Sequence, residues 1–236
     1  MPMSKRVRTK DVITIGGGGG SPTPAAVVWG PDFGEASGND GITSAFGLNI
    51  VSVVANATIT GRLAGKDSWV PNIALCPDDT NKNGTDLNVE GVIATKKDSY
   101  FGWDLSTLPT GATVSAATLT VNVATAPLVA IGGVDLNHIA DGSETWAEAT
   151  IICSTKPALT QFQNDAASWG STGEKSITLN ATARARIAAR MGVGFYTIAL
   201  AAPNTLFTNM VLESTDEGTN DTLGPRLTLT YSKTVI

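Results

Sequence analysis

The stretch YFGWDLSTLPTGATVSAATLTVNV, residues 100–123, decides the fold. Its first part alternates apolar residues with small or polar ones, and its second part does the same from Ala117 to Val123. Between them, Leu-Pro-Thr-Gly at 108–111 has the composition of a turn. A period of two is that of a strand with one buried face, so the stretch predicts two β-strands joined by a turn.

The same kind of pattern recurs in short segments along the chain. We expect further strands at 133–139, 175–179, 195–200, 210–212 and 226–231, and 49–54 could be another. Most interruptions carry Gly, Pro, Asn or Asp, which are turn residues. Many short strands separated by turns predict an all-β fold, a jelly-roll-type antiparallel β-sandwich.

One segment has the signals of a short helix instead. Asn180 can cap it, residues 182–191 are rich in Ala and Arg, and Gly192 can end it. Ile187 and its neighbours one turn away should face the sheet. Three arginines would lie mostly on the solvent side: Arg184, Arg186 and Arg190. The helix is then either a lid over an open end of the sandwich or an arginine-rich site for acidic ligands.

The composition divides the chain into three parts. Residues 1–28 form an extended basic N-terminal arm whose five glycines, 16–20, read as a flexible tether. Residues 29–56 are a turn-rich connecting segment, and 57–236 are the sandwich domain. The residues of the arm that could anchor it to a partner are Lys5, Arg6, Arg8, Lys10, Val12, Ile13 and Ile15.

Charge and cysteine content exclude several classes of protein. The net charge is −5, so the body should not bind nucleic acid through a basic surface. No apolar run is long enough to span a membrane, and no hydrophobic segment follows the basic N-terminus, so we expect no signal peptide and a cytosolic site of production. Two cysteines, Cys76 and Cys153, are too few for a disulfide framework. We expect two buried free thiols rather than one bridge.

Several segments, taken in order, resemble the DNRLRE domain family, a jelly-roll group of bacterial and archaeal surface proteins. The matching segments are DSWVPN at 67–72, NKNGTDLNV at 81–89, the stretch 100–123, TWAEATI at 145–151, SITLNATARARIAA at 176–189 and VLESTDEGTNDTLGPRLTLTY at 211–231. The resemblance implies a jelly roll and suggests polysaccharide binding. The second tryptophan of the family is missing near Cys153, and its Ser-Glu pair is reversed as Glu213-Ser214. No ligand residue is therefore carried over.

One segment matches the spacing of an EF-hand calcium loop. Alternate oxygen-bearing side chains, a glycine at Gly84 and a carboxylate in the twelfth position are what Ca²⁺ requires. The candidate ligands are Asp79, Asn81, Asn83 and Glu90. The flanking residues do not read as helices, so the alternative is a polar hairpin turn with an Asn-Gly bend. We expect no other cofactor.

Catalytic motifs are lacking. The single histidine, His138, lies on a predicted strand, and no nucleophile elbow or metalloprotease motif occurs. We therefore expect no enzyme activity. Among the tryptophans, Trp103 should be in the core, whereas Trp169 is flanked by small polar residues and is the candidate exposed ligand-binding ring.

Two functions fit these features. The first is a virion structural protein, most simply a bacteriophage capsid decoration or head-fibre protein, anchored by its arm to a capsid protein and displaying the sandwich. Its localisation would be the virion, assembled in the host cytoplasm, and we expect a homo-oligomer, for which a trimer is our guess. The alternative is a carbohydrate-binding module that recognises a cell-surface polysaccharide. We expect no nucleic-acid or membrane partner, whereas a host glycan fits either function.

Overall fold

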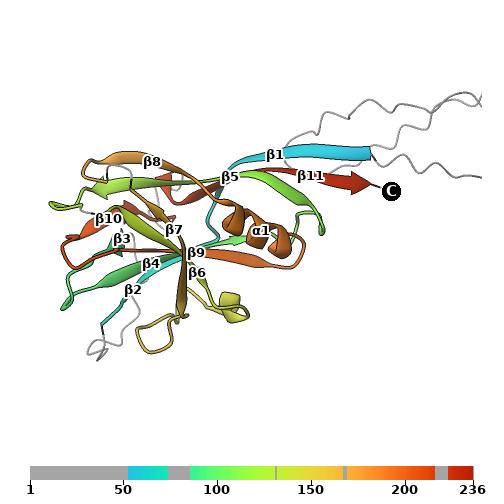
Figure 1. The fold of residues 1–236 in the computed structure, drawn as a ribbon. Coiled ribbons are helices and arrows are strands. Elements are labelled where there is room, and N and C mark those ends of the chain that lie inside the picture. The colour runs from blue at the N-terminus through green and yellow to red at the C-terminus, as the bar shows by residue number, and fades with distance from the viewer. Residues whose placement is uncertain (1–52, 74–85, 131, 167–168, 216–222, 236) are drawn as a thin grey trace, which may run out of the picture.

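The protein folds into two antiparallel sheets stacked as a β-sandwich, with one α-helix (Figure 1). The computed structural model describes residues 53–73, 86–130, 132–166, 169–215 and 223–235. The all-β, jelly-roll-type prediction is confirmed. No helix within these residues is long and apolar enough to cross a membrane.

The first sheet has six strands. In spatial order these are β1 (Val53–Leu63), β11 (Arg226–Val235), β5 (Thr113–Thr125), β10 (Met210–Glu213) and β3 (Asp86–Val89), with β8 (Gly173–Thr178) also paired to β5. The second sheet is ordered β2 (Lys66–Pro71), β4 (Lys97–Asp104), β9 (Phe195–Ala201), β6 (Val134–Ile139) and β7 (Leu159–Asp165). Residues 100–123 supply most of β4 and of β5, one strand for each sheet. The first described strand, β1, begins at Val53.

The core lies between the sheets and follows the alternation in the sequence. On β5, Leu119, Val121 and Val123 are buried, while the residues between them are more exposed. Trp103 of β4 is fully buried and stacks on Tyr196 of β9, so its predicted core position is confirmed. Burial of these apolar faces is the main force that holds the two sheets together.

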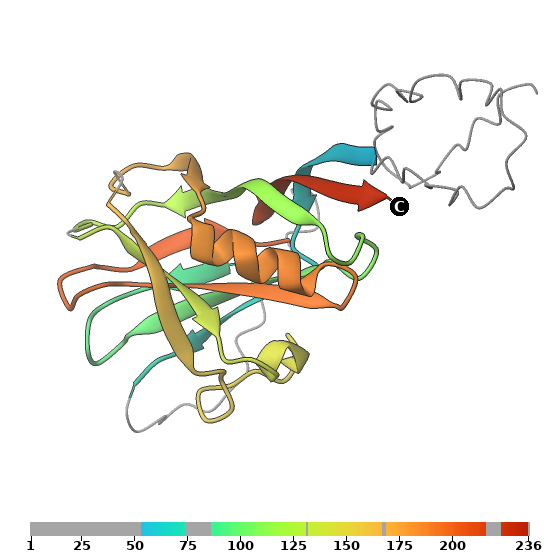
Figure 2. The ribbon, with the colours of Figure 1, turned by 45° about the vertical axis from the view of Figure 1, so that its right-hand side comes forward.

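The helix α1 (Ala181–Arg190) covers one open side of the sandwich, between the two sheets (Figure 2). Asn180 caps it by accepting a hydrogen bond from the Ala183 amide at 3.0 Å. Ile187 is buried against the core, as predicted. Gly192 follows with a φ of 74°, and a Cβ there would lie 2.2 Å from Thr110, so only glycine fits this end of the helix. The lid interpretation of the helix is confirmed.

A second, smaller cluster lies on the outer face of the five-stranded sheet. The excursion between β6 and β7, which contains the short helix η1 (Ser143–Thr145), covers Tyr100 and Val70 there. Lys66 fixes this excursion by donating from Nζ to the carbonyls of Glu144 and Trp146, both at 2.7 Å. Burial lowers the Lys66 pKa to about 8.

The strand directions give the sandwich two distinct ends. At one end Val53 of β1 pairs with Val235 of β11, so the first and last described strands meet there (Figure 1). At the other end the last residues of β3 and β5 lie beside the start of β10, through the pairs Val89–Met210 and Thr125–Val211. We call this second end the distal tip. The β3–β4, β5–β6 and β9–β10 connections all lie on it.

Candidate functional site

The connections of the distal tip are joined to one another by backbone hydrogen bonds. The Gly91 amide of the β3–β4 connection donates to the Phe207 carbonyl of the β9–β10 connection at 2.9 Å. The Thr208 amide in turn donates to the Val129 carbonyl of the β5–β6 connection at 3.0 Å. Three segments far apart in sequence therefore form one surface.

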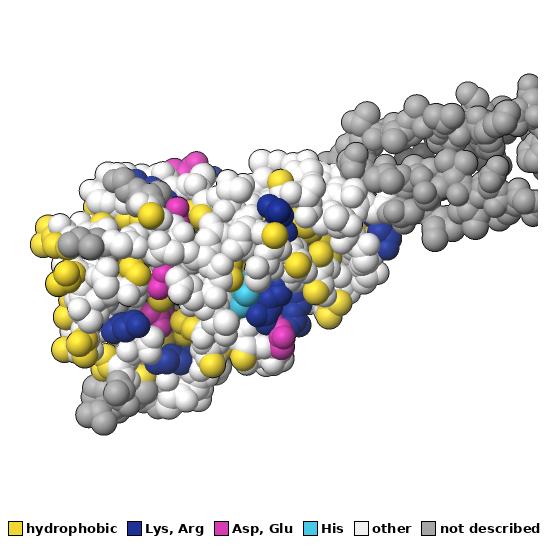
Figure 3. All heavy atoms as spheres, in the orientation of Figure 1, with side chains coloured by type: hydrophobic (Ala, Val, Ile, Leu, Met, Phe, Trp, Pro, Cys, Tyr) yellow, Lys and Arg dark blue, Asp and Glu magenta, His cyan; other side chains and the backbone are white. Residues whose placement is uncertain are grey.

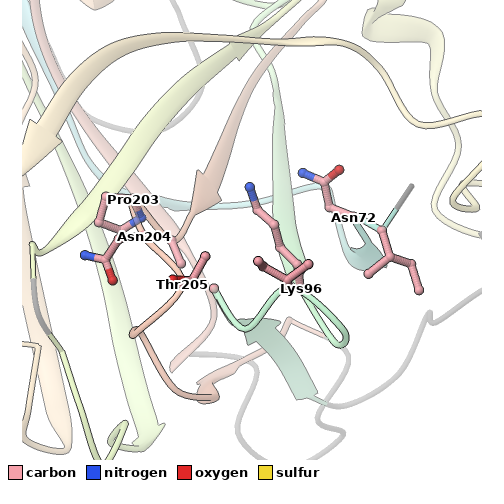
Figure 4. Close-up of a pocket in the computed structure, with 9 residues that line it drawn as sticks. Asn72, Lys96, Pro203, Asn204 and Thr205 are labelled. Carbon is pink, nitrogen blue, oxygen red and sulfur yellow. The ribbon is translucent and has the colours of Figure 1, made fainter. Parts of the chain in front are cut away.

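A pocket of about 250 Å³ opens in this surface (Figure 4). Its lining comes from the end of β2 and from the β3–β4 and β9–β10 connections: Asn72, Ile73, Gly91, Ile93, Lys96, Ala202, Pro203, Asn204 and Thr205. In Figure 4, Lys96 lies between Asn72 on one side and Asn204 and Thr205 on the other. The pocket thus combines four hydrogen-bonding side chains with aliphatic walls.

Asn72 is held in place by a buried carboxylate. Its Nδ2 donates to Oδ2 of Asp98, which is fully buried on β4. Oδ1 of Asp98 has no hydrogen-bond partner among the described residues. Burial raises the Asp98 pKa to about 6, partly offset by the positive charges of Lys96 and Lys156. This hydrogen bond therefore fixes the orientation of the Asn72 side-chain amide.

Lys96 and Lys97 differ in their contacts. The neighbouring Lys97 forms an ion pair with Glu90 at 3.0 Å and donates to Asn209 at 3.2 Å. For Lys96 there is no ion pair or side-chain hydrogen bond within the described part of the chain. Its positive charge acts on the buried Asp98, whose pKa it lowers.

Two glycines allow the loops to close on Asn204. A Cβ at Gly91 would lie 1.8 Å from the Asn204 carbonyl oxygen, so any side chain there would force the connections apart. Gly132 has a φ of 88°, and a Cβ there would lie 2.7 Å from Asn204 Nδ2. The Asn204 side chain itself accepts a hydrogen bond from the Leu206 amide at 2.9 Å.

Exposed aliphatic side chains lie on the connections of the distal tip. Leu128, Ile93 and Leu206 are 95%, 74% and 60% exposed, and each comes from a different connection of the tip. Figure 3 shows hydrophobic atoms gathered at this end of the molecule. Among the described residues the other large exposed aliphatics are Val92, also on the tip, and Val193, just after α1. Grouped exposed aliphatics are typical of a binding surface.

A second hollow, of about 440 Å³, lies within the excursion between β6 and β7. Two of its four hydroxyl side chains are used by their own segment, since Thr150 donates to the Ala147 carbonyl and Thr155 accepts from the Ile152 amide. Lys156 donates to the Pro71 carbonyl at 3.2 Å. These bonds stabilise the excursion, so we place the candidate site at the distal tip.

The arginines of α1 are used within the protein. Arg186 pairs with Asp141 and donates to the Ile139 carbonyl, and Arg190 pairs with Glu144. The alternative of an arginine-rich ligand site is not supported, because the excursion between β6 and β7 supplies the carboxylates. The sequence could not indicate these partners, which lie more than forty positions away.

The expectation that Trp169 is exposed is wrong. Its side chain is 1% exposed and belongs to the core, with Nε1 donating to Asp165 at 3.2 Å. The flanking small residues misled the interpretation, because the Trp169 ring packs into the core. A buried ring cannot stack on a ligand. His138 is packed in the interior, 4.1 Å from the Phe162 ring centroid.

The candidate calcium ligands Asp79, Asn81 and Asn83 lie outside the described residues, as does the whole N-terminal arm with its anchoring candidates. Glu90, the fourth calcium candidate, is described. It forms the ion pair with Lys97, and its backbone bridges to the same residue. Within the described part of the chain, no group of three or more His, Cys, Asp or Glu could hold a metal ion.

The expectation of two free thiols is also wrong, because Cys153 is disulfide-bonded. The other cysteine of the sequence is Cys76, outside the described residues, so a bridge within one chain can join only these two. Cysteine count alone could not reveal a pair so far apart. Cys153 lies in the outer cluster over Tyr100, next to the sheet.

We predict that Cys153→Ser lowers the free energy of unfolding by about 2 to 3 kcal/mol, because a bridge closing a long loop restricts the unfolded chain. Urea unfolding of the variant and of the wild type measures the loss. Wild type treated with reductant is the matched control and should unfold at the same urea concentration as the variant. A denatured, unreduced wild type that reacts with a thiol reagent would contradict the bridge.

No protein-family model matches this chain, and no curated protein matches it significantly. The resemblance to the DNRLRE family therefore stays a prediction. Of the residues that line the tip pocket, Asn72 belongs to the DSWVPN segment. The others lie outside the sequence motifs. No periodic signal could have found them, since they come together only through strand pairing.

Proposed function

We propose that this chain is a non-enzymatic virion structural protein, most simply a bacteriophage capsid decoration or head-fibre protein. The observation that carries the proposal is the arrangement of the two ends of the sandwich. The strand that follows the arm, β1, starts beside the end of β11, at the end opposite the distal tip. A module tethered through residues 1–52 would thus present its tip outward.

Two further features support this proposal. The arm sequence joins a basic head to a run of five glycines, which suits attachment to an acidic protein surface through a flexible tether. The disulfide at Cys153 suits a protein that works in an oxidising environment, such as a virion surface. The proposed partner is a capsid protein, and a homo-oligomer, with a trimer as the first case to test, would match the symmetry axes of a capsid.

The test uses phage capsids assembled without this protein. We expect the full-length chain to bind them and to saturate at a copy number set by the capsid symmetry, whereas a chain lacking residues 1–24 does not bind. A second variant, with serine in place of Lys5, Arg6, Arg8 and Lys10, separates the charge of the arm from its length, and we expect at least tenfold weaker binding. Absence of binding by the full-length chain, or equal binding by the truncated one, would refute the proposal.

A further inference from the structure

We infer that the distal tip is a contact surface for a lipid bilayer, where aliphatic side chains enter the membrane interface and Lys96 meets anionic headgroups. The sequence predicts no membrane partner because it lacks an apolar run long enough to span a bilayer. Contact at the surface of a bilayer, however, needs only a few exposed aliphatic side chains. The inference goes beyond the proposed display function and is tested without capsids.

Large exposed aliphatic side chains are concentrated at this end of the molecule. Of the five in the described part of the chain, four lie on the tip connections: Val92, Ile93, Leu128 and Leu206. Each of the three connections carries at least one of them. Exposed apolar surface is unfavourable in water, and transfer into the interface of a bilayer removes it from water.

The connections that carry these side chains are held together. Besides the two backbone bonds that join them, the Val129 amide donates to the Thr208 hydroxyl at 3.0 Å. Between Leu206 and Thr208, the Phe207 ring is fully buried in the core. Loops fixed in this way need not be ordered when the tip meets a surface, which removes part of the entropic cost of binding.

The tip connections carry little charge in a chain of net charge −5. In residues 90–96, 126–133 and 202–209 the only charged residues are Glu90 and Lys96. Glu90 pairs with Lys97, the first residue of β4. Few charged groups would therefore lose water on contact, and Lys96 complements anionic headgroups. Screening over about 10 Å weakens the repulsion from carboxylates elsewhere on the protein.

The tip pocket supplies hydrogen-bond donors for a headgroup. Lys96 and Thr205 both line it (Figure 4). The oxygens of a lipid phosphate can accept from an ammonium group and from a hydroxyl at the same time. Ile93 lines the same pocket and is 74% exposed, so a cation and an aliphatic side chain lie at one place on the tip.

A second copy of the chain fits the tip less well. A symmetric tip-to-tip contact would bring together the same residues of both copies, including two Lys96 ammonium groups. The one carboxylate in these connections, Glu90, already pairs with Lys97. The charges of the tip thus complement an anionic bilayer better than they complement themselves.

The experiment is co-sedimentation of the free full-length protein with vesicles of phosphatidylethanolamine and phosphatidylglycerol. We expect binding to these vesicles and weaker binding to vesicles of phosphatidylcholine alone. The variant with serine in place of Lys5, Arg6, Arg8 and Lys10 should still bind, which separates the tip from the basic arm. Because capsids are absent, failure here is distinguishable from failure of the arm to anchor the chain.

We expect Leu128→Ser to weaken vesicle binding about tenfold, because a leucine side chain no longer leaves water. Lys96→Ala should weaken binding to the anionic vesicles about fivefold and leave binding to phosphatidylcholine unchanged. The matched control is Val193→Ser, which removes an exposed aliphatic side chain just after α1 and should leave binding unchanged. Circular dichroism checks that each variant is folded.

The inference is overturned if the full-length protein does not bind the anionic vesicles, or if the serine variant of the arm loses binding. Equal binding by Leu128→Ser and Val193→Ser, or by Lys96→Ala and wild type, also overturns it. Sedimentation velocity of the free proteins tests the other occupant. If Leu128→Ser dissociates an oligomer that the wild type forms, the tip is a contact between copies of the chain and the inference is wrong.

Discussion

Replacing Asp67 by alanine is expected to lower the free energy of unfolding by about 4 kcal/mol. Asp67 is fully buried on β2 of the five-stranded sheet. Its Oδ1 accepts from the Ser214 hydroxyl at 2.8 Å, and its Oδ2 accepts from the Thr215 amide at 2.8 Å and the Thr215 hydroxyl at 3.0 Å. Ser214 directly follows β10, so this carboxylate links the two sheets.

The expected loss of stability is large because the substitution leaves buried hydrogen-bond donors without their acceptor. Ser214 is also fully buried, and without Asp67 its hydroxyl and the Thr215 amide lose a charged acceptor that water cannot easily replace. Asp67→Asn keeps an acceptor but turns an amide toward these donors, so we expect an intermediate loss. Urea unfolding measures all three proteins.

Asp86→Ala provides the matched control for Asp67→Ala. Asp86 is an exposed residue at the start of β3, and its replacement should change stability by no more than about 0.5 kcal/mol. A loss below about 1 kcal/mol in Asp67→Ala would show that the link between the sheets is not a main source of stability.

The second prediction concerns two buried groups whose contributions to the pH dependence of stability have opposite signs. Burial raises the Asp98 pKa from 3.8 to about 6, so the folded protein holds a proton that the unfolded chain releases. This contribution to stability is present below about pH 4 and is lost as the pH rises through 6. Ionised Asp98 thus costs about 3 kcal/mol at neutral pH, and Asp98→Asn should stabilise the protein there by up to that amount.

His138 acts in the opposite direction. Burial, with a smaller effect of the Arg186 charge, lowers its pKa from 6.5 to about 4, so the folded protein holds the neutral ring. Its contribution is present above pH 6.5 and is lost as the pH falls through 4. Neither ring nitrogen has a hydrogen-bond partner among the described residues, and the ring stacks on Phe162. His138→Phe keeps the stacking and removes the titration.

The measurement is the free energy of unfolding of wild type and both variants between pH 4 and 7. The advantage of Asp98→Asn over wild type should shrink as the pH falls, because the wild-type carboxyl becomes protonated. The difference between His138→Phe and wild type should instead move in favour of the variant as the pH falls. Because each curve is compared with wild type, other titrating groups cancel. Differences that change in the same direction with pH in both variants would contradict the assignment.

Local sequence was sufficient to predict the helix and seven of the eleven described strands, but not β2, β3 or β7, and the expected strand at 49–54 overlaps β1 only at its start. The alternation in 100–123 predicted β4 and β5 and placed Trp103 in the core, because a period of two sorts side chains onto opposite faces of a sheet. Asn180 and Gly192 predicted the ends of α1, because both act on backbone groups within one turn of the helix. These signals depend only on neighbouring residues, so a single sequence is enough to read them.

The predictions about sites failed or were incomplete where burial or partners depended on distant segments. Trp169 was predicted to be exposed because of its neighbours in sequence, but in the fold it is surrounded by core residues. From the sequence, the arginines of α1 were expected to face solvent, because their partners Asp141 and Glu144 lie on another segment. The disulfide state of Cys153 was likewise not readable from the spacing of two cysteines.

The sequence by itself thus determined the fold class, most of the strands and the helix with its caps, since these depend on side-chain period and on backbone preferences of neighbouring residues. The tertiary structure alone decided the distal pocket, the Asp67 link between the sheets and the buried states of Asp98 and His138. Antiparallel pairing brings Asn72, Lys96 and Asn204 to one end of the sandwich, and that arrangement depends on which strands become neighbours. The packing of other segments over a charged group then sets its burial, and with it the pKa.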